Sequence, residues 1–406
     1  MSGLDARVRD DALAFVAEGA DSMRAETIAL AEINSGSYHA AGVNRVREAL
    51  AELFADLEAE STVLPSPPLE VLDDDGALRE RSLGDGLRLR KRPDAPFQVF
   101  LCGHMDTVFP PDSPFQEFRR QGDTMYGPGV ADMKGGLVVM LYALKALHQA
   151  GELDDLSLSI LLNSDEEVGS LSSRKYLEEQ ARQHDWGLVY EPSGRGNLTR
   201  QRKGLGQARF VVTGRAAHAG SAHEQGRSAI KELAYKIVEI ENMTDYESGV
   251  TVNVGIVSGG EARNTIAPCA EGLIDLRYPE PQQGLDAAAQ FEEIFSQVYS
   301  YPVDSGDIRT ESWVNLHRPP KIPTEESDYL MEKARAIGRL LGQEIGVTDS
   351  GGGTDGSLTQ AVGLPTQDSL GVVGSGAHSN REEARVSSLV ERAQLNAILI
   401  LRERRV

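Results

Sequence analysis

Three short, continuously apolar segments in the first half of the chain constrain its fold more than any other feature. They read FQVFLC at 97–102, LSLSILL at 156–162 and WGLVY at 186–190, and the helix-like pattern LVVMLYALKALHQAG occupies 137–151 between the first two. Continuous apolar strands that alternate with helices are typical of a parallel sheet covered by helices on both faces. The segments therefore predict an α/β fold with a mostly parallel sheet flanked by helices.

The segment before this sheet has a different, amphipathic pattern. Apolar residues spaced three and four apart predict one helix near 8–32 and another from Val43 to about Leu57.

The pattern changes again between about residue 201 and the proline-rich segment HRPPKIP at 317–323. This stretch predicts strands at 208–214, 250–259, 269–278 and near 308–314, with helices around 226–241 and 285–298. We expect a smaller α+β unit of the ferredoxin-like type, with its sheet open on one face. The predicted boundaries are 1–200 and 318–406 for the two parts of the first domain and 201–317 for the inserted one.

Length and charge exclude several classes of protein. A chain of 406 residues is long enough for two cores, and 62 acidic against 41 basic residues give a net charge of −21. Such a charge disfavours a nucleic-acid or anionic-membrane partner. The N-terminal segment predicts no signal peptide, and no apolar stretch approaches the roughly 20 residues that span a bilayer. Only Cys102 and Cys269 are present, which favours a reducing cytoplasm and a packing role for both.

Each of the three strands is followed by a short polar segment. GHMDTVFP starts at residue 103, SDEEVGS at 164 and EPSG at 191, and all three should meet at the carboxyl edge of the sheet, where α/β proteins bind ligands. The glycine-rich turn YGPGVADMKGG (126–136) and the segment GSGAHSN (374–380) add further candidates. The candidate residues are His104, Asp106, Asp132, Glu166, Glu167, Glu191 and His378.

Two imidazoles with several carboxylates are typical ligands of a two-metal site, and zinc is the first choice because calcium and magnesium seldom bind histidine. Two divalent ions are neutralised by Asp132, Glu167 and Glu191 together with a bridging hydroxide, whereas one ion would leave the site negative. One member of the Glu166–Glu167 pair can then bind metal while its neighbour transfers protons.

The motifs resemble those of the co-catalytic di-zinc aminoacylase and carboxypeptidase family. That family includes acetylornithine deacetylase, succinyl-diaminopimelate desuccinylase and the glutamate carboxypeptidases, and the last branch is the most similar. Over residues 103–379, the motifs that follow the family's order are GHMDTVFP, GPGVADMKGG, SDEEVGS, EPS, GRAAHAG, GGEARNTIAP, DLRY, GGGTDGS and GAHS.

The resemblance implies a role for each candidate in the first domain. His104 and Glu191 would bind one zinc, His378 and Glu167 the other, and Asp132 both; Co²⁺ or Mn²⁺ are possible substitutes. Asp106 would orient His104. Glu166 would be the general base that activates a metal-bridging hydroxide, and the Asp132–Met133 peptide would be cis.

The resemblance also implies that the inserted unit is a lid and dimerisation domain. His218 in GRAAHAG would reach the partner subunit's site and stabilise the oxyanion, while Asn264 and Arg277 would contact the substrate carboxylate or oxyanion. Gly352 and Thr354 in GGGTDGS would line the substrate pocket.

Several alternatives remain open at this stage. Arg277 could instead form an ion pair within the lid, and GGGTDGS could be a plain turn. We expect Asp165 to be a solvated loop acid and His39, His148, His184, His223 and His317 to be surface residues. GPGVADMKGG lacks the spacing of a nucleotide-binding loop.

The sequence thus predicts a cytoplasmic, homodimeric di-zinc amidohydrolase that cleaves an N-acyl amino acid or small peptide with a free carboxylate. The alternatives are a biosynthetic deacylase of the acetylornithine type, a dipeptidase, or a non-catalytic relative that only binds. The lid's last strand, IRTESWVNLHRPP (308–320), departs from the glutamate carboxypeptidases, which carry further basic residues there. Arg309, Arg202 or Lys203 could substitute for them.

Overall fold

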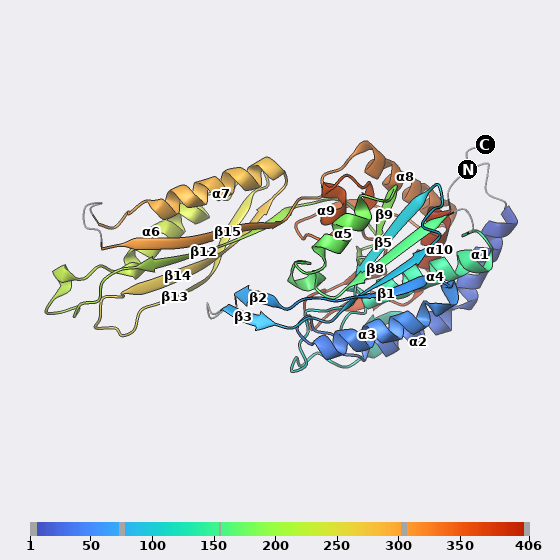
Figure 1. Cartoon of the computed structure of the whole chain (residues 1–406), viewed down its shortest axis with the longest axis horizontal. Coiled ribbons are helices and arrows are strands. Elements are labelled where there is room, and N and C mark those ends of the chain that lie inside the picture. The colour runs from blue at the N-terminus through green and yellow to red at the C-terminus, as the bar shows by residue number, and fades with distance from the viewer. Residues whose placement is uncertain (1–5, 73–77, 154–155, 302–306, 402–406) are drawn as a thin grey trace. The chain divides into compact units, whose positions relative to one another are not determined.

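The three apolar segments become neighbouring strands of one sheet in the computed structural model of the chain (Figure 1). The structure describes residues 6–72, 78–153, 156–301 and 307–401. Strand β5 (Gln98–His104) pairs in parallel with β8 (Ser157–Asn163) on one side and with β9 (Trp186–Val189) on the other. The predicted α/β class is therefore confirmed, with a parallel centre to the sheet.

Three further strands complete this sheet in the order β1-β4-β8-β5-β9-β17. Strand β17 (Thr366–Gln367) is parallel to β9, whereas β4 (Gly86–Lys91) is antiparallel to β8 and β1 (Glu60–Leu64) is antiparallel to β4. Strands β1 and β4 were not predicted; β4 reads GLRLRK, in which charged residues interrupt the continuous apolar run that marks the parallel strands.

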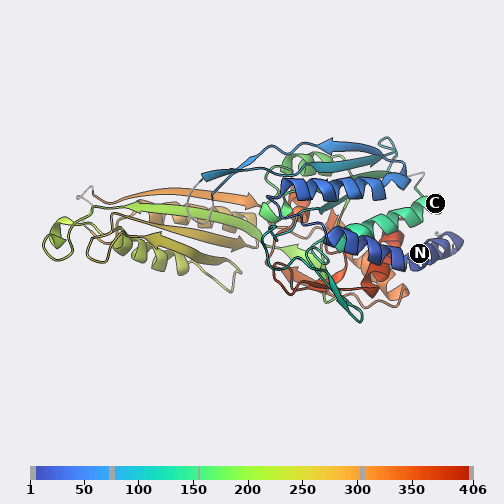
Figure 2. The ribbon, with the colours of Figure 1, turned by 90° about the horizontal axis from the view of Figure 1, so that it is seen from below.

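Helices cover both faces of the sheet. Alternate residues of β5 point to opposite sides, and since those at 99–102 are all apolar, both faces have to be buried. Val99 and Leu101 join the core beneath α4 (Lys134–Gln149), whereas Phe100 and Cys102 join a second core with α5 (Arg174–Ala181) and α9 (Asp355–Ala361). Figure 2, seen from below, looks onto the face covered by α2, α3 and α4. The other helices of this unit are α1 (Ala6–Glu18), α2 (Ala20–Ala31), α3 (Ala40–Leu53), α8 (Glu325–Leu340) and α10 (Ser387–Ile400).

Two details differ from the sequence analysis. The single helix expected near 8–32 is two helices that meet at Gly19, where an added Cβ would lie 2.7 Å from the Tyr142 ring. Cys102 is buried in the core as expected, but Cys269 is exposed, so the packing role predicted for Cys269 was wrong.

Smaller sheets and turns complete the elements around the central sheet. A five-stranded sheet has the order β10-β18-β19-β7-β6, β2 and β3 form a hairpin, and β11 pairs with β16. Their bounds are β10 (Ser193–Gly194), β18 (Val373–Ser375), β19 (Glu383–Arg385), β7 (Thr124–Tyr126), β6 (Arg119–Gln121), β2 (Leu69–Leu72), β3 (Leu78–Arg81), β11 (Leu198–Arg202) and β16 (Val347–Ser350), with short 3₁₀ turns η1 (Ala55–Leu57) and η2 (Glu166–Val168).

The chain divides into two compact units. The second comprises Arg202–Ile322 together with Ser350–Gly353, and the first comprises the remaining residues. The segment Ser350–Gly353, which the sequence analysis placed in the first domain, thus belongs to the second unit.

The second unit has the strand and helix order β-α-β-β-α-β, with an antiparallel sheet ordered β13-β14-β12-β15. Apolar residues on one face of the sheet, such as Phe210 and Ile274, pack against Leu233 and Phe291 of its two helices. Among the described residues of this unit, no helix covers the other face. The elements are β12 (Gly204–Thr213), η3 (His223–Gln225), α6 (Ala229–Glu241), β13 (Thr251–Gly259), β14 (Cys269–Tyr278), α7 (Pro281–Ser296) and β15 (Arg309–Arg318).

A buried ion pair joins the two helices of this unit. Lys236 on α6 donates from Nζ to the carbonyl oxygens of Ile294, Phe295 and Gln297 at 2.7, 3.1 and 2.6 Å, which satisfies the C-terminal end of α7. Its Nζ lies 3.4 Å from Oε1 of Glu232, and both side chains are fully buried.

Replacing Lys236 with methionine is expected to lower the free energy of unfolding by about 3–5 kcal/mol, because Glu232 would remain buried without its cation. Urea unfolding followed by circular dichroism measures this loss. The exposed neighbour Lys231→Met is the control, with a change expected within about 0.5 kcal/mol. Equal stability of the two variants would contradict the structural importance of the pair.

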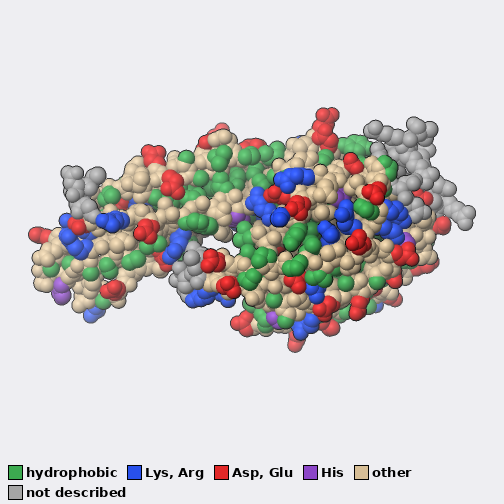
Figure 3. Space-filling model, in the orientation of Figure 1, with side chains coloured by type: hydrophobic (Ala, Val, Ile, Leu, Met, Phe, Trp, Pro, Cys, Tyr) green, Lys and Arg blue, Asp and Glu red, His purple; other side chains and the backbone are tan. Residues whose placement is uncertain are grey.

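On the face drawn in Figure 3, Asp and Glu side chains are interspersed with Lys and Arg over both units. The net negative charge is therefore not gathered into one patch on that face. Within the described residues, no helix is both long enough and apolar enough to cross a membrane.

Candidate metal centre

Several predicted site residues come from the carboxyl ends of the central strands. His104 is the last residue of β5, Glu166 and Glu167 form the η2 turn after β8, and Glu191 follows β9. Parallel strands end at the same edge of a sheet, so these side chains meet although they are far apart in the sequence.

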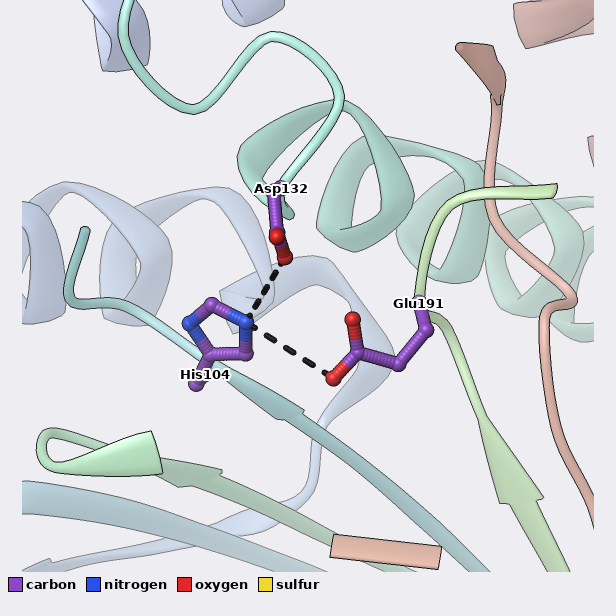
Figure 4. A group of neighbouring side chains, drawn as sticks. All are labelled: His104, Asp132 and Glu191. Carbon is purple, nitrogen blue, oxygen red and sulfur yellow. Dashed lines mark hydrogen bonds and ion pairs between the residues drawn. The ribbon is translucent and has the colours of Figure 1, made fainter. Parts of the chain in front are cut away.

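A first group of possible ligands consists of His104, Asp132 and Glu191 (Figure 4). His104 Nε2 lies 3.1 Å from Asp132 Oδ1 and 3.8 Å from Glu191 Oε1. All three side chains are buried.

A second group consists of Asp132, Glu167 and His378. His378 Nε2 lies 3.0 Å from Glu167 Oε2 and 3.4 Å from Asp132 Oδ2. Asp132 therefore directs one carboxylate oxygen to each histidine. The His378 side chain is 60% exposed, so the centre is accessible to solvent on that side.

Close backbone packing brings Asp132 next to Glu191. Helix α4 begins two residues after Asp132, and a Cβ added to Gly136 in its first turn would lie 2.1 Å from the Tyr190 carbonyl oxygen. Only glycine allows the start of the helix to lie this close to the end of β9. The peptide bond between Asp132 and Met133 is cis, as the resemblance implied.

The carboxylates repel one another in this buried space. Burial and then the charge of Asp132 raise the pKa of Glu167 to about 8, and the same two causes raise the pKa of Glu191 well above its usual range. Burial also opposes the Asp132 charge, yet hydrogen bonds with His104 and His378 hold the Asp132 pKa below its usual range. A site that favours added positive charge and offers imidazole nitrogen and carboxylate oxygen fits divalent metal ions such as zinc.

Asp106 connects His104 to the Glu166–Glu167 turn. Its Oδ1 lies 3.3 Å from His104 Nδ1 and accepts from the Glu166 backbone N–H at 3.2 Å, while Oδ2 accepts from the Glu167 N–H at 3.2 Å. Ser37 Oγ donates to the same carboxylate at 2.7 Å. Asp106 can therefore hold the orientation of His104 and the backbone of both glutamates.

Glu166 belongs to neither group of possible ligands among the described residues. It is 9% exposed, and its charge contributes to raising the pKa of both Glu167 and Glu191. Its carboxylate therefore lies within electrostatic reach of both groups.

Buried aspartates stabilise the turn that carries these glutamates. Asp165 is fully buried and accepts from the Ser172 N–H at 2.7 Å and from Ser173 Oγ at 2.5 Å, so its prediction as a solvated loop acid was wrong. Burial raises its pKa to about 6. Asp355 accepts from Ser170 Oγ at 2.5 Å at the end of the same turn.

Sequence reasoning missed Asp355, Lys134 and Glu382, which are all buried beside the candidate centre. Lys134 and Asp355 stand inside motifs that it did single out, so their charge in those motifs was an available signal. Glu382 stands next to Glu383, and nothing local distinguishes the buried glutamate from its neighbour.

Two of the predicted lid residues lie on adjacent segments of the second unit. His218 is exposed, and its Nδ1 accepts from the backbone N–H groups of Gly220 and Ser221 at 3.1 and 3.2 Å. A neutral ring with this hydrogen-bonding pattern carries its proton on Nε2. The exposed Asn264 is adjacent, because its carbonyl accepts from the Ala219 N–H at 2.9 Å.

Arg277 forms an ion pair within the same sheet. Its Nε and Nη2 donate to Asp275 at 2.7 and 2.9 Å, which agrees with the alternative of a lid ion pair. Gly352 accepts at its carbonyl from Arg202 Nη1 at 3.2 Å.

Thr354 lies in the first unit and caps α9. Its Oγ1 accepts from the Gly356 N–H at 3.2 Å and donates to Asp368 Oδ2 at 2.8 Å. The motif GGGTDGS thus contains a helix start, and this arrangement by itself does not bring Thr354 to the two ligand groups.

The histidines expected at the surface differ in their environment. His223 is exposed, whereas His39, His148, His184 and His317 are partly buried. Burial, followed by the charges of Arg318 and Arg277, lowers the pKa of His317 to about 4 from its usual 6.5.

The His317 environment predicts a pH dependence of stability. Because the unfolded chain binds a proton that the folded ring resists, the free energy of unfolding should fall as the pH drops from 6.5 to about 4, by at most about 3 kcal/mol. Urea unfolding at about pH 7.5 and about pH 4.5 measures this fall. His317→Gln should lose this part of the pH dependence and His223→Gln should keep it; identical pH profiles for His317→Gln and the wild type would refute the assignment.

Comparisons with known proteins support one family. The model of peptidase family M20/M25/M40 matches residues 100–402. Carboxypeptidase G2 of Pseudomonas sp. (strain RS-16) is 34% identical over 308 residues, which cover 75% of this chain and 73% of that protein. Acetylornithine deacetylase of Proteus mirabilis (strain HI4320) is 29% identical over 269 residues, or 61% of this chain and 65% of that protein.

The fold agrees with a solved structure as well. Aminopeptidase PepT from Bacillus cereus ATCC 10987 superposes with a TM-score of 0.74 at 21% identity, covering 94% of this chain and 98% of that one.

Proposed function

Since the chain belongs to peptidase family M20/M25/M40 and is therefore a hydrolase, we propose that it cleaves the amide bond of an N-acyl amino acid or small peptide with a free carboxylate. The observation that carries the proposal is the pair of histidine–carboxylate groups that share Asp132. Zinc is the first choice of metal, at two ions per chain, with Co²⁺ or Mn²⁺ as possible substitutes.

In this proposal His104 and Glu191 would hold one ion, His378 and Glu167 would hold the other, and Asp132 would contribute to both. When bound, the ions supply an activated water and polarise the amide carbonyl. Glu166 takes the proton from the attacking water and gives it to the leaving amine, while Asp106 keeps His104 in place. The products are a carboxylic acid and an amine, the latter being a free amino acid when the substrate is an N-acyl amino acid.

Metal analysis tests the centre of the proposal. The purified protein is expected to contain about two divalent ions per chain, to lose activity on chelation and to regain it with Zn²⁺ or Co²⁺. Full activity after complete chelation would rule the proposal out.

The free carboxylate of the substrate requires a separate test. Dipeptides, N-acyl amino acids and folate-like glutamates should each be compared with the same compound carrying a C-terminal carboxamide. We expect the carboxamides to lose at least about 10²-fold in kcat/KM, because a cationic or hydrogen-bonding partner for the carboxylate would be left unpaired. Equal cleavage of both forms would remove the carboxylate from the proposal.

The same panel separates the related activities. A preference for glutamyl substrates would favour an activity like that of carboxypeptidase G2, and a preference for N-acetyl amino acids would favour the deacylase alternative. Cleavage of unblocked dipeptides would favour a dipeptidase. A cytoplasmic location also remains a prediction, which cell fractionation would test.

We further propose that the second unit is a lid and forms a homodimer. His218 carries an Nε2–H that can donate to an oxyanion, and Asn264 lies beside it. In this proposal Arg277, Gly352 and Thr354 would lie towards the substrate.

Support for the dimer comes from β13, an edge strand of its sheet that exposes Ile256 and Val257. An unpaired strand edge with apolar side chains can pair with a second copy of itself about a two-fold axis.

Sedimentation velocity of the wild type and of Val257→Asp tests the dimer. The wild type is expected to sediment as a dimer and Val257→Asp to shift towards the monomer. If His218 acts across the dimer, mixing His218→Ala with Glu166→Gln subunits should restore activity at one site of the mixed dimer. A fully active monomer would contradict both points.

A further inference from the structure

Glu382 is a buried carboxylate that binds the loop carrying Asp132. It is 1% exposed and lies four residues after His378, in the turn that precedes β19. Its Oε1 accepts from the backbone N–H groups of Ala131 and Asp132 at 2.9 and 3.0 Å, and its Oε2 accepts from the Gly129 N–H at 3.2 Å. One side chain thus fixes three peptide groups around Asp132.

A buried lysine stands at the end of the same loop. Lys134 is fully buried, donates from Nζ to the Ile33 carbonyl at 2.8 Å, and lies within electrostatic reach of both Glu382 and Asp106. The loop encloses this lysine tightly, because a Cβ added to Gly129 (φ +79°) would lie 2.8 Å from Lys134 Cδ. Burial and then the charge of Asp132 raise the pKa of Glu382 to about 7, whereas its hydrogen bonds from the three N–H groups stabilise the carboxylate form.

The chemistry of the contacts explains why an acid is present. Three N–H groups need a side chain that only accepts, and a carboxylate meets that need. A glutamine could offer its carbonyl oxygen to Ala131 and Asp132, but its NH₂ would then face the Gly129 N–H. Replacing Glu382 with glutamine would therefore remove one hydrogen bond and the negative charge while keeping the shape of the side chain.

We propose that Glu382 is a positioning residue that sets the orientation in which Asp132 presents one oxygen to His104 and the other to His378. The inference relies on the proposed function to the extent that Asp132 is taken as a ligand of both ions. Glu382 and His378 are in the same short segment. The hydrogen bond from the Asp132 N–H to Glu382 therefore also holds the backbone near His378 close to the backbone of Asp132, although these two proposed ligands are about 250 residues apart in the chain.

The test compares Glu382→Gln with the adjacent Glu383→Gln, using the full chain. Glu383 is partly exposed and accepts from Ser375 Oγ at 3.0 Å. Glu383→Gln removes the same charge as Glu382→Gln, at the neighbouring position. We expect Glu382→Gln to bind Zn²⁺ and Co²⁺ about 10- to 100-fold more weakly in chelator competition, for both ions, and to change the visible spectrum of bound Co²⁺. Glu383→Gln should match the wild type in both measurements.

A second variant separates position from charge. Glu382→Asp keeps the charge but withdraws the oxygens by about 1.5 Å, one carbon–carbon bond, so it should remain defective. Wild-type affinity and spectrum in Glu382→Asp would show that charge alone matters and would overturn the inference.

The remaining outcomes are also decisive. If the wild type binds two ions and Glu382→Gln binds them as tightly as Glu383→Gln does, this inference fails while the proposed function stands. If the wild type binds no metal, the proposed function fails and the inference with it. If Glu382→Gln does not fold, hydrogen exchange in the wild type decides, since slow exchange of the Ala131 and Asp132 amides supports the contact and fast exchange contradicts it.

Discussion

Replacing Glu166 with glutamine is expected to lower kcat by about 10²- to 10⁴-fold while the protein keeps its bound metal. Glutamine has the same shape but cannot accept the proton of the attacking water. The backbone N–H of residue 166 would still donate to Asp106, so the turn should keep its position. Steady-state kinetics combined with metal analysis of the same sample measures both parts of the result.

Two neighbouring substitutions make this result specific. Glu167→Gln is expected to reduce metal content as well as activity, because Glu167 lies 3.0 Å from His378 Nε2 in the second ligand group. Glu179→Gln on the exposed side of α5 should leave both unchanged. Full turnover by metal-loaded Glu166→Gln would remove Glu166 from the mechanism.

Replacing Asp132 with alanine is expected to abolish activity and to weaken the binding of both metal ions. Asp132 belongs to both ligand groups, whereas Glu191 belongs only to the first. Removal of residues that merely orient ligands costs about 10- to 100-fold in metal affinity, so loss of a shared ligand should cost at least about 100-fold. Titration with Zn²⁺ and with Co²⁺ gives the affinity and the number of ions bound.

Glu191→Ala is the matched comparison for Asp132→Ala. It should weaken the binding of only the ion proposed at His104, and the binding of the ion proposed at His378 and Glu167 should be unchanged. The backbone N–H of residue 132 can still donate to Glu382 in Asp132→Ala, so the metal-free variants should unfold at similar urea concentrations. Loss of a single ion from Asp132→Ala would contradict the shared role.

Much of the first unit could be predicted because its signals are local. The apolar runs that became β5, β8 and β9 are continuous, and the polar segments after them predicted where His104 and Glu191 would meet. Strand β4 was missed because its arginines interrupt the continuous apolar pattern, although β4 lies inside the sheet between β1 and β8.

The sequence could not predict which of the charged residues are buried. Asp165 stands in an acidic loop segment, yet Ser172 and Ser173 donate to it and exclude it from solvent. Glu382 and Glu383 are the same residue type in adjacent positions, and only the distant Gly129–Asp132 loop distinguishes them.

The sequence by itself determined the parallel central strands, the types of candidate ligand and the carboxyl edge at which His104 and Glu191 gather, because these follow from patterns within short segments. Only the tertiary structure decided that Asp132 faces both histidines and that Glu382 holds it there. Those relations depend on which distant backbone amides and side chains come within hydrogen-bonding distance, and that distance is set by how the whole unit packs.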